Sequence, residues 1–170
     1  MAITGSVLRK FYKLAVSSFD KSLCQLFIGA FCFAMRSCEY VKVQGPQKTK
    51  LLTVRNIRFY NGNRLVKHSD PNLSLAECLS ITFEFQKRDS PNYSVNLFRF
   101  SDGKKYLFTG TELLKRLSLA ATVIGEDILG FSAKEIGLHS ARSGAMAMYL
   151  AHVPVFTIML LGRWSSNAFL

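Results

Sequence analysis

Acidic residues are scarce in this sequence of 170 residues, which has 11 Asp and Glu against 22 Lys and Arg and a net charge of +11. Hydrophobic residues nevertheless make up 49% of the chain, which excludes a disordered basic tail and predicts one folded domain with its own core. A folded domain with this excess of positive charge is expected to bind a polyanion, either nucleic acid or an anionic membrane surface.

Cysteine is also sparse. The chain has four cysteines, none of them in a Cys-x-x-Cys pair and none followed by histidine at zinc-finger spacing, so neither a zinc site nor a disulfide framework is predicted. His68, His139 and His152 are too dispersed to indicate a metal site. We therefore expect no metal, and a reducing intracellular compartment suits the free cysteines.

A long uninterrupted membrane-spanning run is missing as well. The apolar stretch from Leu23 to Met35 is too short to span a bilayer and predicts a buried helix. Gly144 to Gly162 is a run of 19 residues without a formal charge, but Pro154 divides it and favours two buried helices. The N-terminus lacks the order of charges and apolar residues typical of a signal peptide. No membrane partner is expected.

The order of secondary structure indicates an α+β fold. The first 40 residues contain no proline and are expected to be helical through Phe33. A strand pattern follows from Leu51 to Tyr60 and meets Asn61-Gly62, a strong hairpin signal. Alternating apolar and polar residues predict further strands over 81–86 and 93–97, joined by a turn at 87–92.

Helices return in the last third of the chain. Thr109 and Glu112 predict a capping box at the start of one helix, and Gly125 predicts its end. Further helices are expected from about His139 and from Pro154 to Gly162. These elements together predict a mainly helical α+β domain with a small antiparallel β-sheet at one side.

Positive charge is concentrated ahead of residue 111. Residues 1–110 hold 17 basic and 7 acidic side chains, whereas 111–170 hold 5 and 4. No acid interrupts the basic residues between Val41 and Ser69, which predicts either a phosphate-facing surface or a solvated face. The candidate phosphate contacts are five basic residues of this stretch and Arg88 of the 87–92 turn. The five are Lys42, Lys48, Lys50, Arg55 and Arg58.

Two short motifs combine side chains that suit an anion. His139 and Arg142, three residues apart at an expected helix start, would share a face where free backbone N–H groups and the helix dipole favour a phosphate. The alternative is a surface arginine beside a capping histidine. Arg36 follows an apolar helix and is costly to bury unless it is paired or faces a ligand, and Glu39 is the candidate orienting partner. The alternative there is a purely structural ion pair.

In chain order, the motifs resemble the catalytic domain of the tyrosine recombinase (phage integrase) family, in particular its eukaryotic mobile-element branch. The residues that carry the resemblance are Arg36 with Glu39, a lysine in a hairpin turn, His139-x-x-Arg142 and Gly162-Arg163-Trp164. The resemblance covers residues 15–170 and implies an integrase-like catalytic core that is incomplete at its C-terminus. Residues 1–14 are then expected to be an N-terminal remnant or linker.

The resemblance implies DNA integration and recombination, with strand cleavage and rejoining through a 3′-phosphotyrosyl intermediate and no metal or nucleotide cofactor. The implied partners are double-stranded DNA and further copies of the chain on the DNA, in the nucleus of a eukaryote. Arg36 and Arg142 would hold the nonbridging oxygens, and His139 would assist proton movement. Lys87 would protonate the leaving oxygen, because an arginine stays charged and is a poor acid. Trp164 could only orient or pack, and Glu39 would fix its neighbours.

The sequence departs from this family at the nucleophile. A tyrosine is expected a few residues after Trp164, and none is present before the last residue, Leu170. Tyr149 is nearest but is expected in the core. We therefore expect a truncated or degenerate recombinase domain that binds DNA without cleaving it unaided. The alternatives are a non-catalytic basic DNA-binding domain, a membrane-associated protein built on residues 144–162, or a tyrosine supplied by another subunit.

Overall fold

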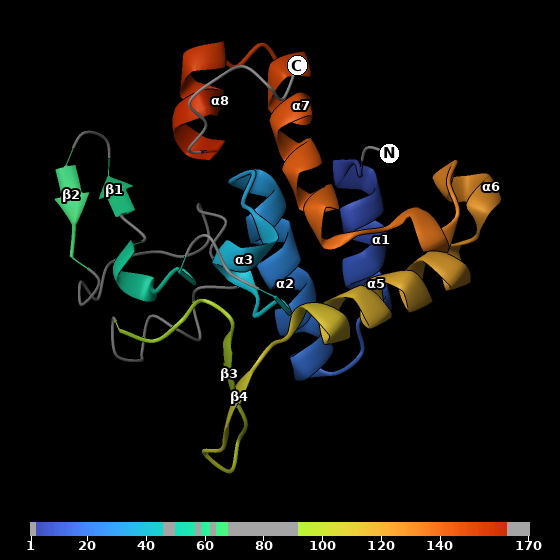
Figure 1. The fold of residues 1–170 in the computed structure, drawn as a ribbon, viewed down its shortest axis with the longest axis horizontal. Helices are drawn as coiled ribbons and strands as arrows, with labels where there is room; N and C mark the ends of the chain where they lie inside the picture. Colours follow the sequence, from blue (N-terminus) through green and yellow to red (C-terminus); the bar gives the residue numbers. More distant parts are fainter. Residues whose placement is uncertain (1–2, 46–49, 57–58, 62–63, 68–91, 163–170) are drawn as a thin grey trace.

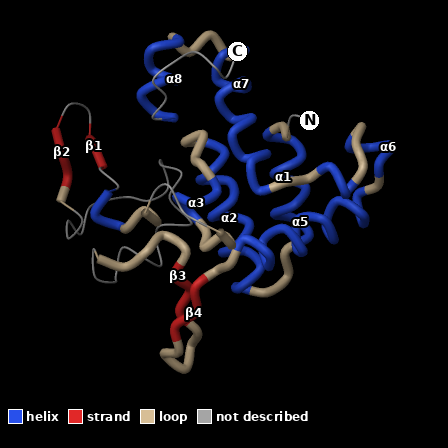
Figure 2. Tube along the Cα trace, viewed as in Figure 1, coloured by secondary structure: helices blue, strands red, loops and turns tan. Residues whose placement is uncertain are grey.

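The computed structural model describes residues 3–45, 50–56, 59–61, 64–67 and 92–162 (Figure 1). The α-helices are α1 Gly5–Leu14, α2 Ser18–Cys32, α3 Ser37–Tyr40, α5 Gly110–Ile124, α6 Glu126–Leu129, α7 Ser143–Leu150 and α8 Val155–Gly162. Three 3₁₀ turns are η1 Val54–Asn56, η2 Ala133–Glu135 and η3 Leu138–Arg142. The strands are β1 Phe59–Asn61, β2 Arg64–Val66, β3 Leu97–Arg99 and β4 Lys105–Leu107. Figure 2 shows helices making up most of the described chain, which confirms the predicted α+β fold with small antiparallel sheets.

The core lies where α1, α2 and α5 meet. Helix α2 begins after Ser17, whose Oγ accepts a hydrogen bond from the Asp20 N–H at 3.0 Å. Its predicted burial is confirmed, because most of its apolar side chains belong to one cluster with those of α1 and α5. Val7 and Phe11 of α1 lie in this cluster, so residues 3–14 pack with the rest of the described chain.

Helix α5 begins and ends where the sequence predicts. The Thr109 Oγ1 accepts a hydrogen bond from the Glu112 N–H at 3.3 Å, and Gly125 ends the helix with a φ of 89°. Between these caps, Leu113, Leu117 and Ala121 follow one another at helical spacing and are all buried. The helix therefore presents one apolar face to the core.

The strands match the sequence prediction in part. The hairpin predicted after Tyr60 is confirmed, because β1 pairs antiparallel with β2 and Asn61 lies opposite Arg64. The strand predicted from Leu51 to Tyr60 is wrong in its bounds, since Val54–Asn56 forms a 3₁₀ turn and β1 begins at Phe59. The strand predicted over 93–97 is wrong in its bounds, since β3 begins at Leu97 and pairs with β4, a strand that the sequence analysis missed. The predicted strand over 81–86 lies outside the described residues.

The apolar run from residue 144 to 162 forms two helices, as predicted. Helix α7 ends in a turn in which His152 has a left-handed φ of 60°, and α8 begins directly after Pro154. The expectation that Tyr149 is a core residue is wrong, because Tyr149 is 42% exposed. Among the described residues, no helix combines the length and apolar character that crossing a membrane requires.

Because of the thiol of Cys24, the folded protein is expected to be less stable at alkaline pH. This residue lies on α2 with its Sγ 3.8 Å from the Phe11 carbonyl, and burial, assisted by Asp20 and opposed by Arg116, raises its pKa from 9.0 to about 11. The unfolded thiol releases its proton first, so the free energy of unfolding should fall as the pH rises from 9.0 to about 11.

Urea denaturation across this pH range checks the expectation on the wild type and on Cys24→Ala. Burial also raises the pKa of Tyr40, which adds its own loss above pH 10.0 in both proteins. The difference between the two curves therefore isolates the thiol. An equally steep fall in Cys24→Ala would contradict the assignment.

Candidate functional site

The turn at the end of α2 fixes where Arg36 lies. Ala34 has a left-handed φ of 47°, and the Met35 N–H donates to the Ala30 carbonyl at 2.8 Å, as in a Schellman motif. Left-handed backbone costs a residue with a Cβ about 1 kcal/mol. The methyl group of Ala34 is fully buried against Ala145 of α7, and this packing holds the turn in place. Arg36 is thereby directed toward the start of α3.

Glu39 holds the backbone at Arg36. Glu39 is 3% exposed, and its carboxylate accepts a hydrogen bond from the Arg36 backbone N–H at 2.7 Å. The Glu39 carbonyl in turn accepts the N–H of Leu52 at 2.8 Å. The Arg36 side chain is half-buried at the start of α3. Glu39 therefore positions Arg36 through a hydrogen bond to its main chain.

The His139 motif lies in a 3₁₀ turn, η3, and the α-helix begins one turn later than predicted, at Ser143. Serine side chains explain the delay, because Ser140 Oγ accepts the Gly137 N–H at 3.1 Å and Ser143 Oγ donates to the Ser140 carbonyl at 2.7 Å. Residues three apart eclipse in such a turn, so His139 and Arg142 still project to one side. His139 is exposed and Arg142 is half-buried.

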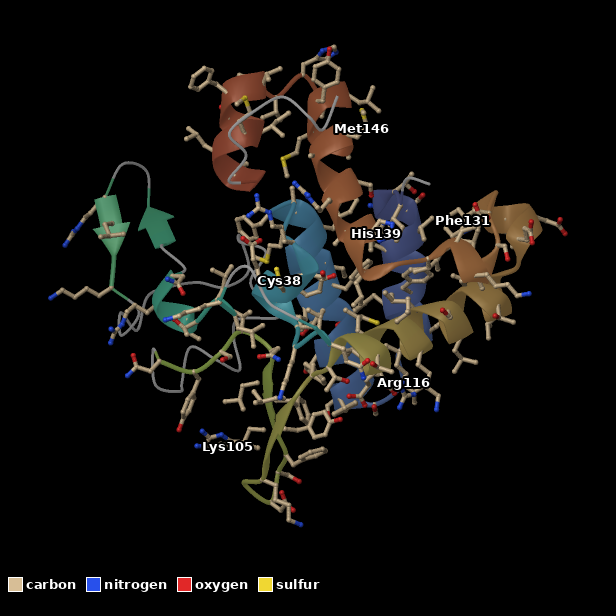
Figure 3. All side chains as sticks on the ribbon, in the orientation of Figure 1. Cys38, Lys105, Arg116, Phe131, His139 and Met146 are labelled. Carbon is tan, nitrogen blue, oxygen red and sulfur yellow. The ribbon has the colours of Figure 1, made fainter. Side chains whose placement is uncertain are left out.

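Gly137 leaves room for the imidazole. A Cβ at this position would overlap the Cε1 of His139 and lie 2.7 Å from its Nδ1, so the ring folds back over the glycine. Figure 3 shows His139 near the foot of α7. The His139 ring therefore lies over Gly137, and a larger residue at this position would require the ring to turn away.

One hydrogen bond joins the two motifs. The Tyr40 Oη donates to the Leu138 carbonyl at 2.7 Å, between residues 98 positions apart in the chain. Tyr40 is fully buried, and this burial raises the pKa of its phenol. Helices α2 and α3 both contact η3. The segment carrying Arg36 and the segment carrying His139 and Arg142 therefore lie side by side.

The other candidate residues fall into two groups. Lys42, Lys50 and Arg55 are exposed. Lys42 forms a bridge with Thr109 just ahead of α5, and Arg55 lies in η1. Outside the described residues lie Lys48, Arg58, Lys87, Arg88 and Trp164.

The two adjacent segments carry side chains that suit the binding of an anion. Arg36 and Arg142 supply permanently charged, fork-shaped donors, and the exposed His139 adds a further donor. Glu39 already accepts the Arg36 backbone N–H through its carboxylate. Within the described part of the chain, no group of three or more His, Cys, Asp or Glu residues could hold a metal ion.

Sequence reasoning missed Tyr40, the residue that joins the motifs. The sequence does show a large aromatic residue directly after Glu39, but its spacing alone did not indicate a role for it. It also missed the basic residues of β3 and β4, Arg99 and Lys105.

Comparisons of the chain with protein-family models, curated proteins and solved structures find no match.

Proposed function

We propose that this chain is a DNA-binding domain of the tyrosine recombinase type, in which Arg36, His139 and Arg142 hold one DNA phosphate. The observation that carries the proposal is the 2.7 Å hydrogen bond from Tyr40 to the Leu138 carbonyl. It joins the two segments whose motifs resemble that family, although they are far apart in the chain. Nothing about the separate motifs in the sequence requires them to meet.

The proposed chemistry is the recognition of a phosphodiester. Arginine matches the nonbridging oxygens of a phosphate with parallel N–H donors, and such charge-assisted bonds are stronger where water is partly excluded. Both arginines are half-buried. In the complete reaction of this type, Lys87 would donate a proton to the leaving oxygen and Trp164 would orient the phosphate. The activity proposed for Arg36, His139 and Arg142 is therefore the binding of a DNA phosphate.

Replacing Arg142 or Arg36 by glutamine is expected to weaken binding to duplex DNA on the order of tenfold, because one charge-assisted bond contributes about 1.5 kcal/mol or more. The slope of log affinity against log salt should fall by about 0.9 in each variant. Fluorescence anisotropy with a labelled duplex at several salt concentrations measures both quantities. Thermal unfolding by circular dichroism checks that each variant is folded.

Arg9→Gln is the matched control, because Arg9 is an exposed arginine on α1 and its replacement removes the same charge. It should change DNA affinity much less than Arg142→Gln. Wild-type affinity in both site variants would contradict the phosphate site. The remaining interpretation would be a non-catalytic basic DNA-binding domain. A wild-type chain that binds no duplex DNA even at low salt would overturn the proposal as a whole.

A further inference from the structure

One face of the hairpin formed by β3 and β4 packs against helix α2. Phe98 lies opposite Tyr106 in the register, so both side chains project to the same face. Phe19 of α2 packs against this face, with its ring centroid 5.2 Å from that of Phe98 and 5.4 Å from that of Tyr106. Phe100 and Phe108 complete the aromatic cluster. This face therefore attaches the hairpin to the helices.

The opposite face of the hairpin places two cations directly across from each other. Arg99 pairs with Lys105 in the register, and both side chains are exposed. Like charges in such a cross-strand pair are destabilising, by a few tenths of a kcal/mol to about 1 kcal/mol. Figure 3 shows Lys105 on the side of the hairpin away from α5. A polyanion that lies along this face would be attracted by both side chains.

Lys105 is held in position by Tyr93. Its Nζ donates to the Tyr93 Oη at 2.6 Å and lies 4.3 Å from the centroid of the tyrosine ring. The base of the hairpin is also fixed, because the fully buried Asn96 donates through Nδ2 to the Phe108 carbonyl at 2.8 Å. A cation on a rigid support loses little conformational entropy when it binds an anion.

Further cations lie on the segment beside Tyr93. The Val54 N–H donates to the Tyr93 carbonyl at 3.0 Å, which places η1 next to the base of the hairpin. Lys50 and Arg55 of this segment are exposed. Two carboxylates among the described residues near the hairpin have contacts elsewhere: Asp102 pairs with Lys104 at 3.0 Å, and Glu112 accepts the hydroxyl of Tyr106, a residue of the opposite face, at 2.8 Å.

We infer that the outer hairpin face, defined by Arg99 and Lys105, docks the phosphate backbone of duplex DNA together with Lys50 and Arg55 of the adjoining segment. The inference rests on the proposed function for its partner and adds a docking surface outside the phosphate site at Arg36 and Arg142. The charge complementarity to a polyanion carries it, together with the cross-strand pair of like charges. The face positions the duplex without reading its bases.

The test is the double variant Arg99→Gln, Lys105→Gln. Its affinity for a labelled duplex should fall on the order of tenfold or more at low salt, and the salt slope should fall by about 1.8, the value for two phosphate contacts. The resistance of the variant to urea should stay close to that of the wild type, because both side chains are exposed. Lower affinity together with unchanged or higher stability separates lost docking from misfolding.

The control is Lys10→Gln, Lys134→Gln, which removes the same charge from exposed positions on α1 and η2. It should keep most of the wild-type affinity. The inference would be overturned by equal losses of DNA affinity in the two double variants, or by wild-type affinity in the hairpin variant. The variants of Arg36 and Arg142 test the proposed function separately. Loss of binding to anionic phospholipid vesicles with DNA binding intact would also overturn it, because the face would then bind membranes.

Discussion

Replacing Gly144 by alanine is expected to lower the free energy of unfolding by about 3 kcal/mol. Gly144 is buried in the first turn of α7, where a Cβ would overlap the backbone carbonyl oxygen of Phe31 and lie 3.3 Å from its ring. The obstacle is main chain rather than the end of a flexible side chain, so α7 has to move away from α2. That movement would also displace Arg142, two residues earlier.

Urea denaturation followed by circular dichroism measures this effect, and Gly5→Ala provides the same substitution in a different setting. Gly5 lies in the first turn of α1, and a Cβ there would meet only an Arg9 side-chain atom at 3.8 Å. Alanine at this position should stabilise the protein by about 0.5 kcal/mol through helix propensity. Wild-type stability in Gly144→Ala would contradict the close packing of α7 against the end of α2.

The second large effect is expected for Tyr40→Phe, which should lower the free energy of unfolding by about 2 kcal/mol. Phenylalanine keeps the buried ring and removes the hydroxyl that donates to the Leu138 carbonyl at 2.7 Å. The carbonyl then loses a partner in a region where Tyr40 itself is fully buried. Because this bond joins the two motifs, binding of duplex DNA should weaken as well.

Tyr106→Phe is the matched control for this substitution. The Tyr106 hydroxyl also makes a short hydrogen bond, 2.8 Å to Glu112, but its side chain is 36% exposed. Water can replace that partner, so the loss should stay below about 1 kcal/mol. Chemical denaturation and DNA anisotropy on both variants give the comparison. Equal losses of stability would show that the Tyr40 bond has no special weight in joining the motifs.

The helices could be predicted because their signals are local. Thr109 caps α5 as predicted, although the Glu112 carboxylate bonds to Tyr106 and does not complete the capping box, and the proline-free apolar run gives α2. The break between α1 and α2 was missed although Ser17 and Asp20 carry a readable N-cap signal. Strand β4 was missed because adjacent lysines interrupt the apolar alternation, and its pairing with β3 depends on tertiary packing against Phe19.

The candidate site could be predicted only as separate parts. Arg36 with Glu39 and His139 with Arg142 were selected from the sequence, and the structure places their segments side by side. Their connection through Tyr40 depends on a contact between distant residues, which no periodicity reveals. The expected α-helix at His139 was wrong because serine side chains bond to the nearby backbone and favour a 3₁₀ turn.

The bond between Tyr40 and Leu138 closes a loop of 98 residues, and Ser143 bonds to the backbone of Ile3 across 140 residues. Contacts of such high sequence separation form late, since the entropy of closing the loop is lost before the contact stabilises the chain. A phosphate held between the two segments would bind the native state alone and would raise the melting temperature with its concentration. The ability to bind DNA would then report that folding of this chain has been completed.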